Sequence, residues 1–281
     1  MKTISKVFSC ILAFSSLLGS VEGQNRYKIW YDKPASYWEE ALPIGNGRIA
    51  AMVFGDPQLE QIQLNEETVS AGSPYQNYNE EAKAALPEMR RLIFEGKYEE
   101  AQNMAATKIL SQVGNEMPYQ TVGRLNIRYQ DHKKVSNYYR DLDISNAMTV
   151  TRYKVDGVEF TEETFASFTD QLVIRHIKSS KPGAINCELF FNTPMRDPKR
   201  SIYGKKGLRL EGITHGSRYF PGKVHYCADL DVKNKGGEVT MANDTLLSVQ
   251  GASELTLYIS MATNFVNYKD ISGDPYQRNK T

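Results

Sequence analysis

The run Trp38-Glu39-Glu40-Ala41-Leu42-Pro43-Ile44-Gly45-Asn46-Gly47-Arg48-Ile49-Ala50-Ala51-Met52-Val53-Phe54-Gly55 says most about the architecture of this chain. Apolar residues lie on both sides of Gly45-Asn46-Gly47, and glycine and asparagine tolerate the positive φ angles of a tight turn. Residues 49–54 form a short apolar run of the kind that is buried in a β-sandwich. In the block that follows, Glu60-Gln61-Ile62-Gln63-Leu64-Asn65-Glu66-Glu67-Thr68, apolar and polar residues alternate as in a half-buried strand. The pattern predicts short strands separated by turns.

The clearest helical pattern lies between residues 82 and 109. Apolar residues recur at helical spacing over residues 82–94 and again over residues 98–109, and Glu95-Gly96-Lys97 is predicted to cap the first helix and turn into the second. Pro87 predicts that the first helix starts late or kinks at that point. We expect a helical hairpin that is laid against, or inserted into, a β-domain.

From Tyr119 onward the pattern returns to strands. Asp156-Gly157 separates strand-like runs at 150–155 and 158–164, and this is the strongest hairpin signal in the chain. Turn signals such as Gly236-Gly237 separate most of the further predicted strands, which lie at 172–177, 187–191, 207–213, 224–232, 246–249 and 255–261. This spacing predicts a mainly β protein, a large β-sandwich (supersandwich) with an inserted helical hairpin.

Composition restricts the classes of partner. The chain is 41% hydrophobic and 24% charged, which permits an ordinary core, and 34 basic against 33 acidic residues leave a net charge of +1. This balance gives no reason to expect nucleic acid or an anionic membrane as a partner. None of the four histidines has metal-ligand spacing to another histidine or to a cysteine, so we predict no metal site and no cofactor.

The first residues indicate export. Two lysines precede an apolar stretch at 7–18, which is too short to span a bilayer, and Val21-Glu22-Gly23 offers small residues for cleavage near Gln24. We therefore predict a signal peptide at 1–23 and a periplasmic or extracellular location. Cys10 suggests a lipoprotein as an alternative, which we disfavour because too little apolar sequence precedes it. No other segment has the length and apolarity of a membrane span.

Cys187 and Cys227 remain after removal of such a signal. In an exported protein they could form one disulfide, or they could be buried free thiols on two separate strands. The sequence leaves both possibilities open, and we favour free thiols.

The chain resembles the glycoside hydrolase family 95 α-L-fucosidases. In that family a "W-x-E-A-L-P-I-G-N-G-R-x-G-A-M-x-F-G" run precedes "x-Q-L-N-E-x-T", as the two blocks quoted above do here. Residues 86–101 resemble the family's "L-P-x-I-R-x-L-x-x-x-G-x-Y-x-E-A", and residues 139–144 its "Y-x-R-x-L-D-L". Residues 156–167 and 170–173 are similar to "D-G-V-x-Y-x-R-E-x-F-A-S" and "D-Q-V-x-V". The similarity covers residues 27–275.

Two departures from the family pattern bear on specificity. The family often has Trp-Ser-Gly after "N-E-x-T", whereas this chain has Val69-Ser70-Ala71-Gly72 and lacks that tryptophan. Residues 119–123 are similar to the start of the family's "Y-Q-x-L-G-D-L". After the glycine of this motif, Arg124 and Asn126 stand where Asp and an apolar residue are usual. These changes indicate a divergent specificity or a decayed copy.

The resemblance implies a division of the chain and a role. Residues 24–268 would form the family's N-terminal β-sandwich, and residues 269–281 would start a linker to the catalytic (α/α)6 barrel, which is absent from this sequence. The family hydrolyses terminal fucose, often α-1,2-linked, with inversion, and its catalytic residues belong to the barrel. This chain would support or orient the barrel, and fucosylated oligosaccharides or plant or host glycans would be substrates of the parent enzyme.

Two alternatives stay open. The chain could be a free-standing carbohydrate-binding module, which a cluster of exposed aromatic residues beside polar groups would favour. An exposed apolar patch near Asn46 and Asn65 would instead favour a hydrolase domain that contacts a barrel. The parent enzyme could also act on α-L-galactosides.

We assign no catalytic residue and four candidates for substrate or barrel contact: Trp38, Asn46, Asn65 and Glu66. Inverting hydrolysis needs two carboxyl groups about 6.5–9.5 Å apart. Glu66 and Glu67 are neighbours on a strand and point to opposite faces, so at most one of them can face a site. The competing interpretation is a loop that is held by hydrogen bonds from side chains to the backbone. Trp38 could stack on a glycan or pack against protein.

Overall fold

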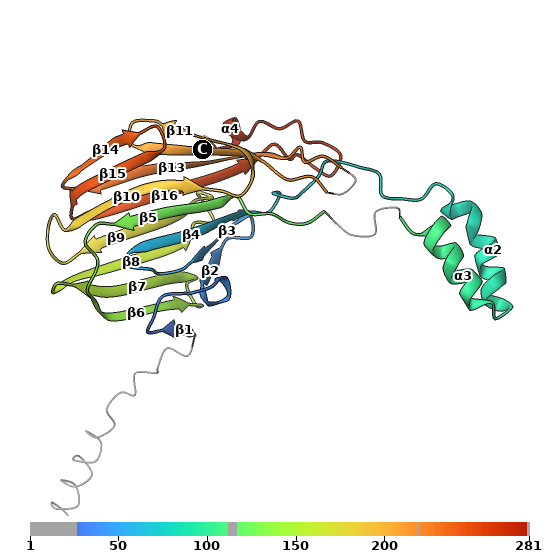
Figure 1. Cartoon of the computed structure of the whole chain (residues 1–281), viewed down its shortest axis with the longest axis horizontal. Coiled ribbons are helices and arrows are strands. Elements are labelled where there is room, and N and C mark those ends of the chain that lie inside the picture. Colours follow the sequence, from blue (N-terminus) through green and yellow to red (C-terminus); the bar gives the residue numbers. More distant parts are fainter. Residues whose placement is uncertain (1–26, 112–116, 218–219, 280–281) are drawn as a thin grey trace, which may run out of the picture.

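The computed structural model describes residues 27–111, 117–217 and 220–279, so the predicted signal peptide at 1–23 and Cys10 lie outside the described residues. Within these described ranges, sixteen strands form two antiparallel sheets that pack face to face (Figure 1). The nine-stranded sheet has the order β1 (Lys28–Tyr31), β6 (Val135–Asp143), β7 (Met148–Val155), β8 (Val158–Ala166), β9 (Val173–Ser179), β16 (Glu254–Thr263), β13 (His225–Lys235), β12 (Gly207–Ile213), β11 (Arg196–Tyr203). The seven-stranded sheet has the order β14 (Glu238–Asn243), β15 (Leu246–Ala252), β10 (Ile185–Asn192), β5 (Gly123–Tyr129), β4 (Leu59–Glu66), β3 (Ile49–Val53), β2 (Leu42–Gly45).

Alternation along the strands builds one core between the sheets. In β4 every second residue is buried, so Ile62 and Leu64 point inward together with Glu60 and Glu66. Leu125 and Ile127 of β5 and Leu255 and others of β16 join the same buried cluster. The predicted large β-sandwich is confirmed, and the described residues contain no helical barrel.

The hairpin predicted at Asp156-Gly157 is present between β7 and β8. Both residues have positive φ, 48° and 82°, which matches the right-handed twist of the flanking strands. The predicted strand ranges include none of β5, β6, β11 and β14. Of these, β11 and β14 are edge strands with mostly exposed residues, so neither carries the apolar alternation by which a strand is found.

The helical hairpin is inserted between β4 and β5. It consists of α2 (Ala82–Phe94), α3 (Tyr98–Met104) and a π-helical turn, η2 (Ala105–Ile109). Figure 1 shows it projecting away from both sheets, so the hairpin is inserted into the β-domain and not laid against it. The expected late start at Pro87 is wrong, because α2 begins at Ala82 and continues through the proline. Because proline has no backbone N–H, the helix lacks one backbone hydrogen bond at that position.

The long connections gather at one end of the sandwich, which we call the loop end. Their described residues are 46–48, 67–111, 117–122, 167–172, 214–217, 220–224 and 264–274. Tight turns such as residues 156–157, 204–206 and 236–237 lie at the opposite end. Long loops on a rigid scaffold are where binding residues concentrate, so the loop end is where a site is expected.

The segment 269–279 is anchored to the nine-stranded sheet. The short helix α4 (Pro275–Arg278) begins at Asp274, whose side chain accepts hydrogen bonds from two backbone N–H groups of the helix. Pro275 and Asn279 are buried, and the Asn279 amide donates a hydrogen bond to Asp229 on β13 at 3.0 Å. The segment therefore packs, although it is polar and aperiodic in sequence, and its role as the start of a linker stays a prediction.

Candidate functional site

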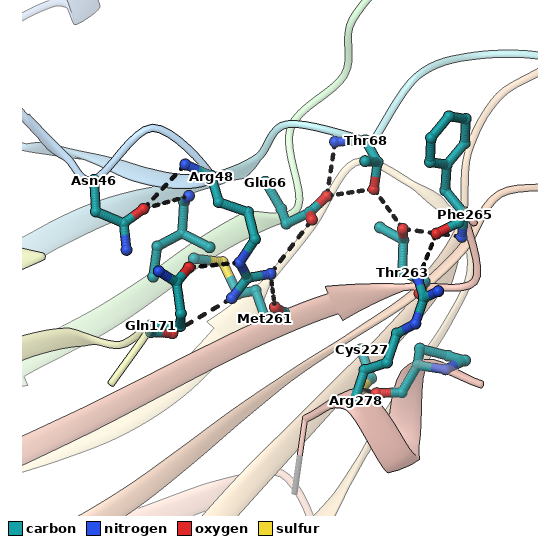
Figure 2. Close-up of polar contacts among 12 residues, drawn as sticks. Asn46, Arg48, Glu66, Thr68, Gln171, Cys227, Met261, Thr263, Phe265 and Arg278 are labelled. Carbon is teal, nitrogen blue, oxygen red and sulfur yellow. Dashed lines mark hydrogen bonds and ion pairs between the residues drawn. The ribbon is translucent and has the colours of Figure 1, made fainter. Parts of the chain in front are cut away.

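Arg48 is the centre of a polar network at the loop end (Figure 2). It lies just before β3 in the seven-stranded sheet, and its guanidinium group reaches the nine-stranded sheet. There it donates hydrogen bonds to the Gln171 side chain at 2.7 Å and to the Met261 carbonyl at 2.9 Å. It also faces the Glu66 carboxylate at 3.4 Å. One side chain thus ties the two sheets together.

Asn46 shapes the turn that positions Arg48. Its side-chain oxygen accepts hydrogen bonds from the backbone N–H groups of Arg48 at 3.0 Å and Ile49 at 2.9 Å. Its amide nitrogen donates to the Ser167 carbonyl in the nine-stranded sheet's β8–β9 connection at 2.8 Å. Gly47 supplies the positive φ of 96°. Asn46 therefore acts on the backbone, as turn asparagines do.

Glu66 is 4% exposed and its carboxylate is fully engaged. It accepts hydrogen bonds from the Thr68 backbone N–H at 2.8 Å and hydroxyl at 2.6 Å, and it pairs with Arg48. Burial raises the pKa of Glu66 above its ordinary value, and the hydrogen bonds from Thr68 offset part of that rise. The Thr68 hydroxyl in turn contacts the Thr263 hydroxyl at the end of β16. These contacts support the interpretation of a loop that is held by side-chain hydrogen bonds to the backbone.

The structure brings two of the four candidate residues together. Asn46 and Glu66 share the Arg48 network, whereas Trp38 lies in the helical turn η1 (Trp38–Glu40), at the far end of β2 from Asn46. Asn65 is half-buried and points to the other face of β4 from Glu66. Sequence reasoning overlooked Arg48, although it stands inside the Gly-Asn-Gly-Arg motif that marked the turn.

A cavity of about 640 Å³ opens beside this network. Its walls come from residues 67–77 after β4 and from residues 265–271 after β16, and Met117 and Val224 complete the lining. Thr68 belongs both to this lining and to the network that Figure 2 shows. Glu67, the exposed neighbour of Glu66, faces the cavity, so the two carboxylates do lie on different sides as predicted.

A second charged cluster is sealed between the sheets. The guanidinium group of Arg175 on β9 donates hydrogen bonds to Glu60 on β4 at 2.8 Å, to Thr164 at 2.7 Å and to Glu162 on β8. All three charged side chains are at most 1% exposed. Burial beside a second carboxylate raises the pKa of Glu60 to about 7, and the charge of Arg175 limits that rise. Because no solvent reaches these carboxylates, the cluster is structural.

Cys187 and Cys227 are free and buried, and they lie in different sheets, on β10 and β13. The prediction of free thiols is confirmed. Within the described ranges, no three His, Cys, Asp or Glu side chains are grouped so that they could hold a metal ion. In the same part of the chain, no helix has the length and apolarity needed to cross a membrane.

Comparison with known families identifies the domain. Residues 29–268 match the model of a family described as "Glycosyl hydrolase family 65, N-terminal domain". The chain belongs to this family. The match covers most of the sandwich, including the loop-end network and the hairpin insertion.

Curated relatives are named α-fucosidases. The chain is 31% identical over 261 residues to "Alpha-L-fucosidase 2" of Arabidopsis thaliana, with 85% of this chain and 30% of the relative covered. It is 22% identical to "Probable alpha-fucosidase A" of Aspergillus oryzae, covering 92% of this chain and 36% of the relative. It is 26% identical to the protein of the same name from Aspergillus niger, covering 54% and 20%. The recognition of an α-L-fucosidase-type N-terminal domain is confirmed, and the chain spans about a third or less of each relative.

Proposed function

We propose that this chain is the N-terminal β-sandwich domain of an exported α-L-fucosidase-type hydrolase. The parent enzyme releases terminal fucose from fucosylated oligosaccharides or glycans with inversion, in the periplasm or outside the cell. The domain supports or orients an (α/α)6 catalytic barrel and is not itself catalytic. The observation that carries this proposal is the similarity to "Alpha-L-fucosidase 2" along 85% of this chain.

The state of the three buried carboxylates at Glu60, Glu66 and Glu162 supports a non-catalytic role. General acid–base hydrolysis needs carboxyl groups that reach both faces of a glycosidic bond. Glu66 is bound to Thr68 and Arg48, and Glu60 and Glu162 are sealed in the core. None of the three has a free oxygen that could meet a substrate.

Apolar side chains at the loop end support contact with a further domain. Phe168 is 77% exposed and follows Ser167, whose carbonyl binds Asn46. Tyr119, which donates a hydrogen bond to the Glu66 carbonyl, is also exposed, as is Val266 after β16. Exposed apolar side chains beside the network are typical of an interaction surface. They support the hydrolase domain over a free-standing module.

The test compares two preparations for fucose release from fucosyllactose. One is the native protein, immunopurified from source cells with an antibody against residues 24–281, and the other is the chain 24–281 alone. We expect release by the native protein and none by the chain. If the chain 24–281 alone releases fucose, and the Glu66→Gln variant does not, the non-catalytic role is overturned. If the native protein releases galactose from an α-L-galactoside faster than it releases fucose, L-galactose would be the preferred sugar.

A further inference from the structure

The cavity at the loop end has walls that are fixed from both sheets. On one side Thr68 is held by Glu66, and on the other Thr263 precedes Phe265 in the wall. The contact between the Thr68 and Thr263 hydroxyls joins the two sides. Arg278 of α4 adds a hydrogen bond to the Thr263 carbonyl at 3.2 Å and another to the Phe265 carbonyl. The cavity is therefore preorganised, which lowers the entropic cost of binding a ligand.

Several polar side chains in the lining are free to bind a ligand. Within the described part of the chain, the carboxylate of Glu67, the hydroxyl of Ser73 and the amide of Asn77 have no hydrogen bond or ion pair. Their neighbours Glu66 and Thr68, by contrast, are fully engaged. A few uncommitted polar groups in a concave, partly apolar lining are typical of a small-molecule site.

Aromatic rings complete the lining. Tyr268 is 73% exposed, and Phe265, three positions before it in the sequence, also lines the cavity. Tyr75 packs against Phe220 with ring centroids 4.5 Å apart, so its ring is held in place. The flat apolar faces of such rings suit the C–H faces of a sugar, while the tyrosine hydroxyls remain able to hydrogen-bond.

The charge of the lining restricts the ligand further. Among the described residues of the lining there is one carboxylate, Glu67, and neither a lysine nor an arginine. The ammonium group of Lys269 lies 5.2 Å from the centroid of the Tyr268 ring but does not line the cavity, so inside the lining a phosphate, a sulfate or a uronic acid would meet the Glu67 carboxylate. A neutral ligand with many hydroxyl donors fits best, because a carboxylate only accepts hydrogen bonds.

We propose that this cavity is a glycan-binding site that takes a neutral mono- or disaccharide unit. Tyr268 and Phe265 stack on the sugar, and Glu67 and Asn77 bind its hydroxyl groups. The volume of about 640 Å³ lies within the range of about 300–1,000 Å³ that is usual for ligand pockets. The choice of glycan as ligand rests on the proposed function. Glu66 and Arg48 are positioning residues for the wall and do not touch the sugar.

The experiment measures binding of fucosyllactose and of lactose to the chain 24–281 by saturation-transfer NMR and calorimetry. We expect saturable binding with a dissociation constant on the order of millimolar, weakened about tenfold or more by Tyr268→Ala and by Glu67→Gln. Phe168→Ala is the matched control, since Phe168 is equally exposed at the loop end but lies outside the cavity lining. Equal unfolding temperatures of the variants show that each one folds.

The outcomes separate this site from the proposed function. Binding of either sugar that both cavity variants weaken and the control leaves unchanged supports the site. Absence of saturable binding up to about 10 mM, or binding that the cavity variants do not alter, overturns it. In that case the exposed rings would be a contact for the rest of the parent protein. Fucose release by the native protein is a separate measurement, so either proposal can fail while the other stands.

Discussion

Replacement of Arg175 by methionine is expected to be among the most destabilising single changes in the sandwich. Arg175 is fully buried and donates hydrogen bonds to Glu60, Glu162 and Thr164. Methionine fills a similar volume but leaves two carboxylates between the sheets without a cation. Loss of one partner from a buried ion pair costs about 3–5 kcal/mol. That loss is a large fraction of the whole stability of an ordinary domain, about 5–15 kcal/mol.

The measurement is urea unfolding of the chain 24–281, followed by circular dichroism at pH 7. Arg91→Met is the matched control, because Arg91 pairs with Glu88 and Glu95 on the exposed surface of α2, where water screens the charges. We expect the control to change the unfolding midpoint little. A loss for Arg175→Met no larger than that of the control would refute the reasoning.

A combined variant tests the mechanism. If the loss comes from uncompensated charge, adding Glu60→Gln and Glu162→Gln to Arg175→Met should recover part of the stability, because a buried charged cluster can be replaced as a unit at little net cost. Lowering the pH toward 5 should also narrow the gap between Arg175→Met and the wild type, since the uncompensated carboxylates then take up protons. A gap that does not change with pH would point to lost packing in place of charge.

Three further expectations concern Glu60, the two cysteines and Gly157. The folded-state pKa of Glu60, about 7, lies above its ordinary value near 4.5, so the folded state binds more protons between these pH values and the contribution of Glu60 to stability falls as pH rises through them. Glu60→Gln should therefore flatten the pH dependence of the unfolding free energy in urea, by at most about 3 kcal/mol across the window. An unchanged dependence on pH would contradict the raised pKa of Glu60. Cys187 and Cys227 should react with Ellman's reagent only on unfolding, because both are buried and burial raises the pKa of Cys227 to about 12. Rapid reaction of the folded chain would show that the sandwich opens. Gly157→Ala should cost about 1 kcal/mol in urea unfolding through backbone strain at φ 82°, since nothing lies within 4 Å of an added Cβ, and a loss of several kcal/mol would mean that the hairpin turn contacts other residues.

Local patterns were sufficient for most of the architecture. Alternation at Ile62 and Leu64, the Asp156-Gly157 turn and the helical spacing of residues 82–109 each correspond to an element of the structure. These signals depend on neighbours in the chain, which the sequence displays directly. They failed at β11 and β14, where polar edge strands are held by pairing with one neighbour and bury few side chains.

The candidate site was only half predictable. Asn46 and Glu66 could be nominated from the motif, but their tie through Arg48 to Gln171 and Met261 joins residues up to 213 positions apart. Trp38 belonged to the same motif and lies at the other end of β2. A motif gives proximity along the chain and does not say which residues of the facing sheet lie opposite.

The sequence by itself determined the class of the protein, the order of most elements and the family of the domain, because these depend on periodicity, turn chemistry and motif order. Only the tertiary structure decided that Glu60 faces Arg175 across the core, that Glu66 is bound while Glu67 is free, and that residues 67–77 and 265–271 enclose one cavity. Alternation tells which face of a strand a side chain occupies. What that side chain meets is fixed by how two sheets stack, and this depends on contacts between distant parts of the chain.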